Sequence, residues 1–396
     1  MGRFGPGLLV TAAFVGPGTV TTASLAGAEY GLGLLWALAF SLATTLVLQE
    51  MAARVGLVTR RGLAEALRET IAAPGLRVAV LALVIAAVGV GNAAYQAGNL
   101  VGAAAGATLV TGLPAPVLAA GCAVLAALLL ATGRYALVER GLVALVVLMS
   151  LLFLVTALLR PPTAASLLPV LPTGDAALTT LALVGTTVVP YNLFLHASAV
   201  RDHWSDAVPL PRALAEARLD TTVSVSLGGL VTLAIMSTAA SAWFGRGVAL
   251  TPAELAEQLG PLVGEAARVC FALGLLAAGL TSAVTAPLAA AWAVAGACGW
   301  PAQLDDRRFR SVWATVLAVG TAFAVTDAQP LATILFAQAA NGLLLPVVAI
   351  ALLWVANRED LLGSHRNGLV SNVAGVAVIA VTLLLGGRRL FTLFAG

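Results

Sequence analysis

The feature that most constrains this chain is a succession of apolar runs, each roughly 20 residues long, joined by short polar links. A run of that length crosses the hydrocarbon core of a bilayer as one helix. Only helices and closed barrels satisfy their own backbone in lipid, and these runs lack the strict alternation of barrel strands. Charged residues make up only 10% of the chain, against about 25% in soluble domains. The sequence therefore predicts an all-α polytopic membrane protein.

About eleven spans are expected, with no separate soluble domain, so residues 1–396 would form a single transmembrane domain. The expected spans are 8–28, 33–55, 77–105, 114–132, 138–159, 178–200, 219–243, 264–297, 310–326, 330–356 and 369–387. If the N-terminus is cytoplasmic, 16 of the 21 arginines fall in cytoplasmic segments, as the positive-inside rule requires. We therefore expect a multi-pass protein of the cell membrane, with the N-terminus in the cytoplasm and the C-terminus outside. The net charge of +3 then reflects topology, and no nucleic-acid partner is expected.

Two spans contain residues that interrupt a helix near mid-membrane. The first carries Gly16-Pro17-Gly18, and the sixth carries Pro190. These positions correspond if 8–159 and 178–356 are two halves of five spans each, with 369–387 as an extra helix. An odd number of spans gives the halves opposite orientations in the membrane. Either interruption alone could be a simple kink, but a matched pair in inverted halves is typical of the central site of a secondary transporter.

Small and neutral polar residues surround both interruptions, and none of the 18 acidic residues falls there. The hydroxyl groups and the two half-helix N-termini favour a small oxyanion or a neutral solute over a divalent cation. The alternative is that the threonines bond back to carbonyls of their own helices. Two amides of span 330–356 are also within expected reach. The candidate substrate-binding residues are Gly16, Pro17, Gly18, Thr19, Thr22, Thr186, Thr187, Val189, Pro190, Tyr191, Gln338 and Asn341.

Further polar residues lie inside spans and are candidates for a proton or substrate pathway. His196 lies in the sixth span beyond Pro190, and a histidine at membrane depth is either a relay group or a satisfied structural residue. Asn92 and Gln96 belong to a polar stripe in the third span that also includes Tyr95 and Asn99. This stripe either lines a water-filled path or joins helices. The seam formed by Thr281, Ser282 and Thr285 is interpreted as packing rather than as ligands.

Several segments resemble the Nramp divalent-metal transporters. GPGTVTTASLAGAEYGLGLLWAL resembles their first helix, and VVPYNLFLHASAV resembles their sixth. LQEMAARVGLVTRRGLAEAL, GLTSAVTAPLAAAWAVAGACGW and AQAANGLLLPVVAIALLWVAN are similar to their second, eighth and tenth helices. The resemblance covers nearly the whole chain. It implies the LeuT-type inverted repeat (5+5), about eleven helices with helices 1 and 6 broken, and alternating access.

The departures from the family pattern fall on its metal ligands. Gly16 stands where the family has its metal-binding Asp, Thr19 where it has Asn, and Val189 where it has Met. Tyr191 replaces the first histidine of the sixth helix, whereas His196 and Gln338 match the family.

The interpretation that follows is an Nramp-related secondary transporter whose carboxylate-free central site suits a small anion such as bicarbonate, with no resident metal. The alternative is an Nramp-type importer of a divalent metal cation, Mg²⁺ or Mn²⁺, with Mg²⁺ keeping most of its water. A membrane sensor that no longer transports is a third possibility, and an enzyme is not expected. The expected partners are a small inorganic ion, the lipid bilayer and a coupled H⁺ or Na⁺, with no cofactor.

Overall fold

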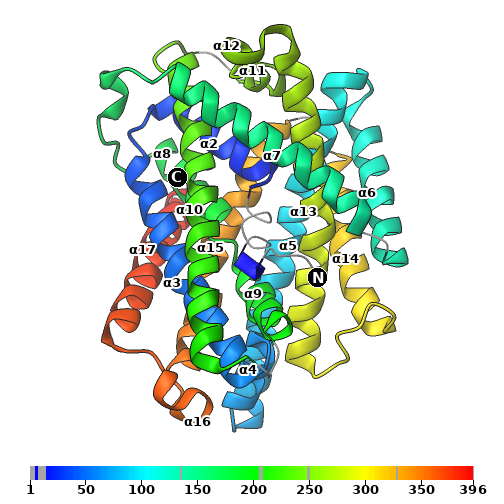
Figure 1. Ribbon diagram of the computed structural model, residues 1–396, viewed down its shortest axis with the longest axis vertical. Helices are drawn as coiled ribbons and strands as arrows, with labels where there is room; N and C mark the ends of the chain where they lie inside the picture. The colour runs from blue at the N-terminus through cyan, green and yellow to red at the C-terminus, as the bar shows by residue number, and fades with distance from the viewer. Residues whose placement is uncertain are drawn as a thin grey trace.

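The computed structural model describes residues 5–7, 15–133, 136–204, 208–247, 250–326 and 329–395, and these form helices and connecting loops without a strand (Figure 1). The long helices are α2 (Pro17–Tyr30), α3 (Leu35–Thr59), α5 (Pro74–Thr111), α6 (Ala115–Thr132), α7 (Ala136–Leu159), α8 (Asp175–Thr187), α9 (Pro190–His203), α10 (Leu210–Trp243), α13 (Ala267–Cys298), α14 (Arg307–Ala324), α15 (Pro330–Ala356) and α17 (Leu369–Ala395). Shorter helices are α4 (Leu63–Thr70), α11 (Pro252–Glu257), α12 (Gly260–Val263) and α16 (Glu359–Leu362). Three 3₁₀ turns cover Ala164–Leu167, Gly264–Ala266 and Gly363–His365.

Nine helical segments of the described chain are long and apolar enough to cross a membrane. The expected span 8–28 is described only from residue 15, because residues 8–14 lie outside the described chain. The expected span 310–326 is the helix α14, which is not among the nine. A multi-pass helical membrane protein is therefore confirmed, while the count of eleven stays a prediction.

One expected span consists of more than one helical piece. Span 264–297 falls within the apolar segment Gly260–Cys298, in which α12 and a 3₁₀ turn precede α13. Gly264 ends α12 with a positive φ of 56°, a conformation that glycine adopts without steric cost. The chain therefore turns at this glycine before the long helix starts.

The sixth span consists of two helices. Helix α8 ends at Thr187, Val188 and Val189 follow, and α9 begins at Pro190. Proline has no N–H to donate to the preceding turn, but it is well tolerated as the first residue of a helix. The backbone hydrogen bonds of α8 end where the Val188 N–H donates to the Val184 carbonyl, 2.8 Å away. Those of α9 begin where the Asn192 N–H donates to the Val189 carbonyl, 3.0 Å away.

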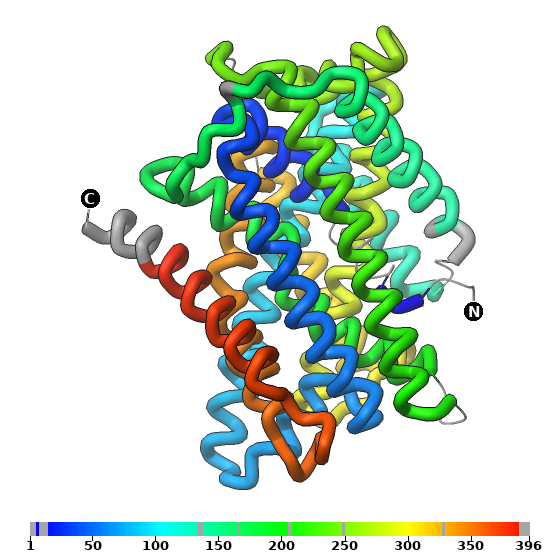
Figure 2. Tube along the Cα trace, turned by 60° about the vertical axis from the view of Figure 1, so that its left-hand side comes forward, coloured from blue at the N-terminus to red at the C-terminus, as the bar shows by residue number. Residues whose placement is uncertain are grey.

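The helix contacts between the first five spans and the next five occur in equivalent pairs: if one span packs on a second, the counterpart of the second packs on the counterpart of the first. Helix α2 packs on α10, while α8 and α9 pack on α3. Likewise α5 packs on α15 and α13 packs on α7, and the central pair α5–α13 makes the most extensive contact (Figure 2). Two repeated halves would produce this pairing. The division into halves 8–159 and 178–356 itself stays a prediction, as does the orientation in the membrane.

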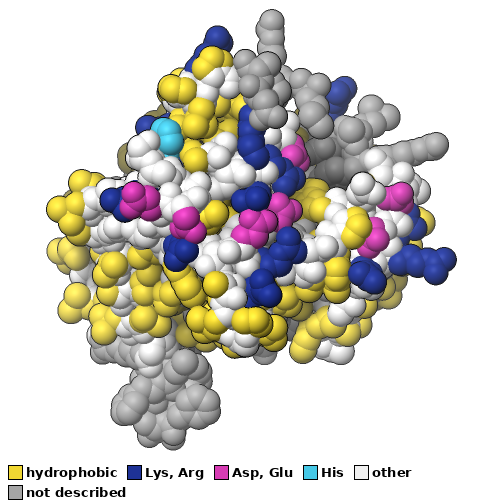
Figure 3. Space-filling model, turned by 90° about the horizontal axis from the view of Figure 1, so that it is seen from below, with side chains coloured by type: hydrophobic (Ala, Val, Ile, Leu, Met, Phe, Trp, Pro, Cys, Tyr) yellow, Lys and Arg dark blue, Asp and Glu magenta, His cyan; other side chains and the backbone are white. Residues whose placement is uncertain are grey.

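Charged side chains gather at the end of the molecule that carries α4 and α16 (Figure 3). Four ion pairs hold this end together: Arg54–Glu50 (3.1 Å), Arg218–Glu50 (3.0 Å), Arg201–Glu65 (3.4 Å) and Arg61–Glu69 (2.7 Å). Arg218–Glu50 connects α10 with α3, and Arg201–Glu65 connects α9 with α4, whereas the other two pairs are local. We call this end the arginine-rich face.

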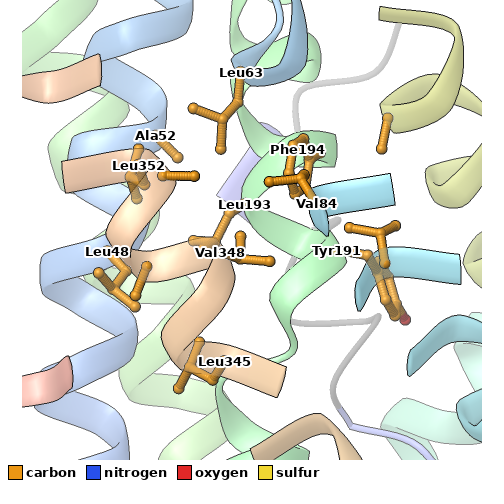
Figure 4. Packing of buried hydrophobic residues seen from close by; sticks show 14 of the residues in the cluster. Leu48, Ala52, Leu63, Val84, Tyr191, Leu193, Phe194, Leu345, Val348 and Leu352 are labelled. Atoms are coloured by element: carbon orange, nitrogen blue, oxygen red, sulfur yellow. The ribbon is translucent and has the colours of Figure 1, made fainter. Parts of the chain in front are cut away.

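The apolar core lies between α3, α9 and α15 above that face. Leu48, Leu193 and Leu352 are all fully buried in it. Tyr191 lies at its edge, with its hydroxyl directed away from the labelled leucines (Figure 4). This packing fixes α9, so the residues just after the interruption have a defined place.

Candidate substrate site at the interrupted helices

Helices start in the same way at the two interruptions that the sequence predicts, and the first of these is described only from residue 15 onward. Helix α2 begins at Pro17, with Gly16 as its N-cap residue, and α9 begins at Pro190, with Val189 as its N-cap residue. Neither N-cap residue has a side chain that bonds to the first turn. The first N–H groups of a helix have no partner within it. Both helix starts therefore keep backbone donors near the middle of the molecule.

A hydrogen bond between hydroxyls joins the two interruptions. Thr19 Oγ1 lies 2.9 Å from Thr186 Oγ1, and both side chains are fully buried. Two residues that are 167 positions apart in the chain thus meet where the sequence placed one site. The Thr187 hydroxyl, by contrast, donates to the Leu183 carbonyl of its own helix, 2.9 Å away. This is the alternative that the sequence analysis left open for the threonines. The Thr187 hydroxyl hydrogen is therefore not available to a ligand in this state.

Glycines bring other helices close to the start of α2. A Cβ at Gly18 would collide with the side-chain amide of Gln338, so this amide on α15 lies against bare backbone. A Cβ at Gly16 would lie 3.1 Å from Ser282 Oγ on α13 and 3.8 Å from the Tyr95 hydroxyl on α5. Helices α2, α5, α13 and α15 therefore converge on residues 16–18.

Several buried polar atoms around this point have no hydrogen-bond partner within the protein. They include Ser282 Oγ and both Nε2 and Oε1 of Gln338. Both side-chain polar atoms of Asn192, and Thr22 Oγ1, are also buried without a partner. Buried polar groups are nearly always satisfied, by protein or by ordered water. Such a concentration of unsatisfied atoms is typical of a place that holds water or an ion.

The ring of Tyr191 packs edge-to-face on that of Tyr95, with centroids 5.5 Å apart. This contact ties the first turn of α9 to α5. Val189, whose side chain is also buried, presents only methyl groups. The described residues contain no group of three or more His, Cys, Asp or Glu that could hold a metal ion. The donor set at residues 16–18 is therefore neutral and consists of hydroxyls, amides and backbone.

The three pathway candidates have different surroundings. His196 is fully buried and its Nδ1 lies 2.8 Å from Gln49 Oε1. An amide oxygen only accepts, so Nδ1 donates and Nε2, which has no partner, keeps its lone pair. Gln96 Nε2 donates to the carbonyl of Ala283 at 3.1 Å, so this residue joins α5 to α13. Asn92 Nδ2 donates to the Val88 carbonyl of its own helix at 2.8 Å.

Asn341 lies further along α15, with Oδ1 3.3 Å from the position of a Cβ at Gly91. Its Nδ2 has no partner. It therefore faces α5 near the polar stripe and away from Gly18.

Sequence reasoning missed two residues of this site. Ser282 was assigned to a packing seam, yet its hydroxyl faces Gly16 and has no partner. Its neighbours do behave as packing residues: Thr281 donates to Ala277 and Thr285 to Thr281. Residues one position apart on a helix point about 100° apart, so the spacing shows that Ser282 points differently from Thr281, but not which helix it faces. Tyr95 was predicted only as a member of the polar stripe of the third span, and its hydroxyl lies near Gly16.

The family assignment rests on a comparison with protein-family models. The model described as natural resistance-associated macrophage protein-like, Nramp, matches residues 7–392. The chain belongs to the Nramp family. Among curated relatives, the divalent metal cation transporter MntH of Acidiphilium cryptum is 29% identical over 401 residues, covering 98% of this chain and 89% of the relative. The MntH of Deinococcus radiodurans is 26% identical over 404 residues, covering 99% and 90%.

Solved structures show the same fold. A manganese transporter of Eremococcus coleocola superimposes with a TM-score of 0.76 at 22% identity, covering 96% of this chain and 84% of that one. Mhp1, a nucleobase-cation-symport-1 family transporter, gives 0.59 at 14% identity, covering 98% and 93%. The predicted LeuT-type fold is thus confirmed, and this Nramp protein is a multi-pass membrane transporter. The expectation that it is not an enzyme agrees with its transporter relatives.

Proposed function

We propose that this Nramp protein transports a divalent cation, Mg²⁺ or Mn²⁺, that passes the central site partly hydrated. The relatives named above are called divalent metal cation transporters, and the Eremococcus coleocola structure is that of a manganese transporter. These names support the cation alternative of the sequence interpretation. They give no support to bicarbonate.

The observation that carries the proposal is the set of buried, unpartnered oxygens around residues 16–18. Ser282 Oγ and Gln338 Oε1 both belong to this set. Oxygen is the ligand type that hard cations prefer, whereas softer transition metals gain from sulfur. Val189 offers no sulfur, so the donor set fits a hard cation best.

The neutral charge of the site sets the expected binding strength. Carboxylates normally compensate a divalent cation, and the residues around Gly16 supply none. Mg²⁺ dehydrates reluctantly and usually keeps several waters. Hydroxyl and amide oxygens can bind those waters without replacing them. We therefore expect weak binding, and selectivity that depends on the size of the hydrated ion.

A proton is the proposed coupling ion. His196 is the fully buried imidazole next to the interruption, and its Nε2 is an unpartnered acceptor. A buried imidazole with an unpartnered nitrogen can take up a proton and release it again, as a proton relay inside a membrane requires. No comparably placed carboxylate that would bind Na⁺ faces residues 16–18 in the described chain.

A small anion such as bicarbonate is the second candidate. What favours it is that α2 and α9 both start at the interruptions, at Pro17 and Pro190. Helix N-termini carry a partial positive charge and attract anions. The same neutral donor set could bind the oxygens of an anion by donating hydrogens.

Calorimetric titration of the purified protein tests the assignment. Gln338→Leu and Ser282→Ala should each weaken Mg²⁺ and Mn²⁺ binding several-fold, because a ligand oxygen or a water-binding oxygen is lost. Thr232→Val is the matched control, since this fully buried hydroxyl bonds back to Gly228 on α10. Bicarbonate binding that falls in both variants, with no measurable cation binding in wild type, would favour the anion instead.

A further inference from the structure

A cavity of about 340 Å³ lies at the end of the molecule opposite the arginine-rich face. It is formed where the ends of α7 and α10 meet α11 and α12 (Figure 1). Arg160 follows the last residue of α7, and Arg246 follows the end of α10. Its lining includes none of the residues around the interruptions, so it is a separate site.

The charges that line this cavity have no partners of their own. Arg160, Arg246 and Glu257 are exposed, and none of them forms an ion pair with another residue that the structure describes. Two guanidinium groups and one carboxylate leave the cavity with net positive charge. Arginine's planar fork matches the paired oxygens of phosphate. A phosphate group therefore suits this lining.

The inner wall of the cavity is held rigidly. Gln258 is buried, and its Nε2 donates to Ser24 Oγ at 2.9 Å and to the Leu255 carbonyl at 2.9 Å. Thr238 Oγ1 donates to Gln258 Oε1 at 3.1 Å. A wall fixed in this way needs no ordering when a ligand binds, which favours binding.

The side of the cavity next to α7 faces lipid. Leu158 and Leu159 are 83% and 57% exposed and directly precede Arg160. Apolar side chains exposed on a spanning helix contact acyl chains, and an arginine just beyond them lies at the level of the head groups. Trp243, which lines the cavity, is an aromatic residue of the kind found at that interface.

We propose that this cavity binds the phosphate diester of a phospholipid head group. Arg160 and Arg246 donate to the phosphate oxygens. Glu257 accepts from an ammonium or hydroxyl group of the same head group. The acyl chains lie along the exposed leucines of α7. This site is independent of the substrate and of the transport function proposed above.

Native mass spectrometry of the full-length protein, titrated with phosphatidylglycerol and phosphatidylethanolamine, tests the proposal. Each of Arg160→Gln and Arg246→Gln should weaken binding of the first lipid about tenfold, because each removes a charge-assisted contact. Arg268→Gln is the matched control, an exposed arginine outside the cavity that bonds to the Leu109 carbonyl. The thermal unfolding midpoint of each variant without added lipid checks that it is folded.

The outcomes separate the sources of the phosphate. Lipid binding that is unchanged when Arg160→Gln and Arg246→Gln are combined would overturn the site. A loss of lipid binding in Arg268→Gln as large as in the cavity variants would also overturn it. Glycerophosphoglycerol that binds as tightly as the lipid would show a soluble ligand and overturn the lipid assignment. Glu257→Gln should reduce the binding of phosphatidylethanolamine more than that of phosphatidylglycerol, since only the former carries an ammonium.

Discussion

Gly16 leaves the start of α2 without a side chain, and two hydroxyls lie near the space that a side chain would take. Ser282 Oγ and the Tyr95 hydroxyl lie 3.1 Å and 3.8 Å from the position of a Cβ there, and Tyr95 packs on Tyr191. The site therefore handles its ligand through dipoles rather than through a fixed charge. An ion in such a place gains less from direct attraction and must keep part of its hydration.

A carboxylate at position 16 should change this balance. Gly16 has an extended backbone, with φ −120° and ψ −171°, so Gly16→Asp brings no backbone strain and Asp is a good N-cap residue. We expect divalent-cation binding to tighten by about tenfold or more, because one charged contact contributes about 1.5–3 kcal/mol. Calorimetry with Mn²⁺ measures this. Gly75→Asp is the control, since a Cβ there meets nothing within 4 Å. Weaker Mn²⁺ binding in Gly16→Asp would contradict a cation site.

Sequence patterns predicted this residue-scale chemistry in part. The meeting of Thr19 and Thr186 follows from two interruptions at matched positions. The contribution of Ser282 could not be predicted, because a short helical seam does not reveal which member faces which neighbour. That direction depends on the crossing of α13 with α2 and α5, which is set by packing over the whole molecule.

Buried side chains connect the middle of α2 to its surroundings. Gln258, just beyond α11, bonds to Ser24 on α2 and accepts from Thr238 on α10. Three elements thus share one buried amide. The interruption at Pro190 was predictable from proline chemistry alone, whereas this cross-link depends on a loop whose path the sequence does not specify.

Removing that amide should loosen the contact between α2 and α10. Gln258→Leu leaves the buried hydroxyl of Ser24 without this partner, and an unsatisfied buried group costs about 1–3 kcal/mol. Thr238 keeps its hydrogen bond to the Ile235 carbonyl, 2.9 Å away. We expect a lower thermal unfolding midpoint in detergent. Gln303→Leu, at an exposed loop position, should leave the midpoint unchanged. Equal midpoints for Gln258→Leu and wild type would show that the cross-link does not contribute to stability.

At the scale of the whole molecule, α4 packs against the end of α9 at the arginine-rich face. Arg201 on α9 pairs with Glu65 on α4, and a Cβ at Gly62, which precedes α4, would lie 2.9 Å from Ser198 Oγ. Helix α4 therefore covers the end of α9. Alternating access requires such contacts to open and re-form.

Weakening this contact should expose Ser198 more often. Glu65→Gln removes a partly exposed ion pair, and such pairs contribute at most about 1 kcal/mol, or roughly fivefold in population. We expect maleimide to label Ser198→Cys up to about fivefold faster in that background, with the three native cysteines replaced by alanine. Glu69→Gln, which loses only its pair with Arg61, is the control. Identical rates for the two backgrounds would argue against a closing role for Glu65.

The global fold was the most predictable part of this protein. The apolar runs predicted a helical membrane protein, which depends on local composition, and the resemblance of several segments to the Nramp family implied the fold. The substrate was not predictable in the same way. A neutral oxygen site can bind either a hydrated cation or an anion, and the sequence reasoning favoured bicarbonate while the relatives favour a divalent metal.

Flux into proteoliposomes tests the central claim most directly. Vesicles containing the wild-type protein are given Mg²⁺, Mn²⁺ or bicarbonate separately, under an inward proton gradient. We predict protein-dependent uptake of a divalent cation that falls several-fold in Gln338→Leu, stays unchanged in Thr232→Val, and is absent for bicarbonate. Uptake of bicarbonate that falls in Gln338→Leu, together with no uptake of Mg²⁺ or Mn²⁺, would contradict the account.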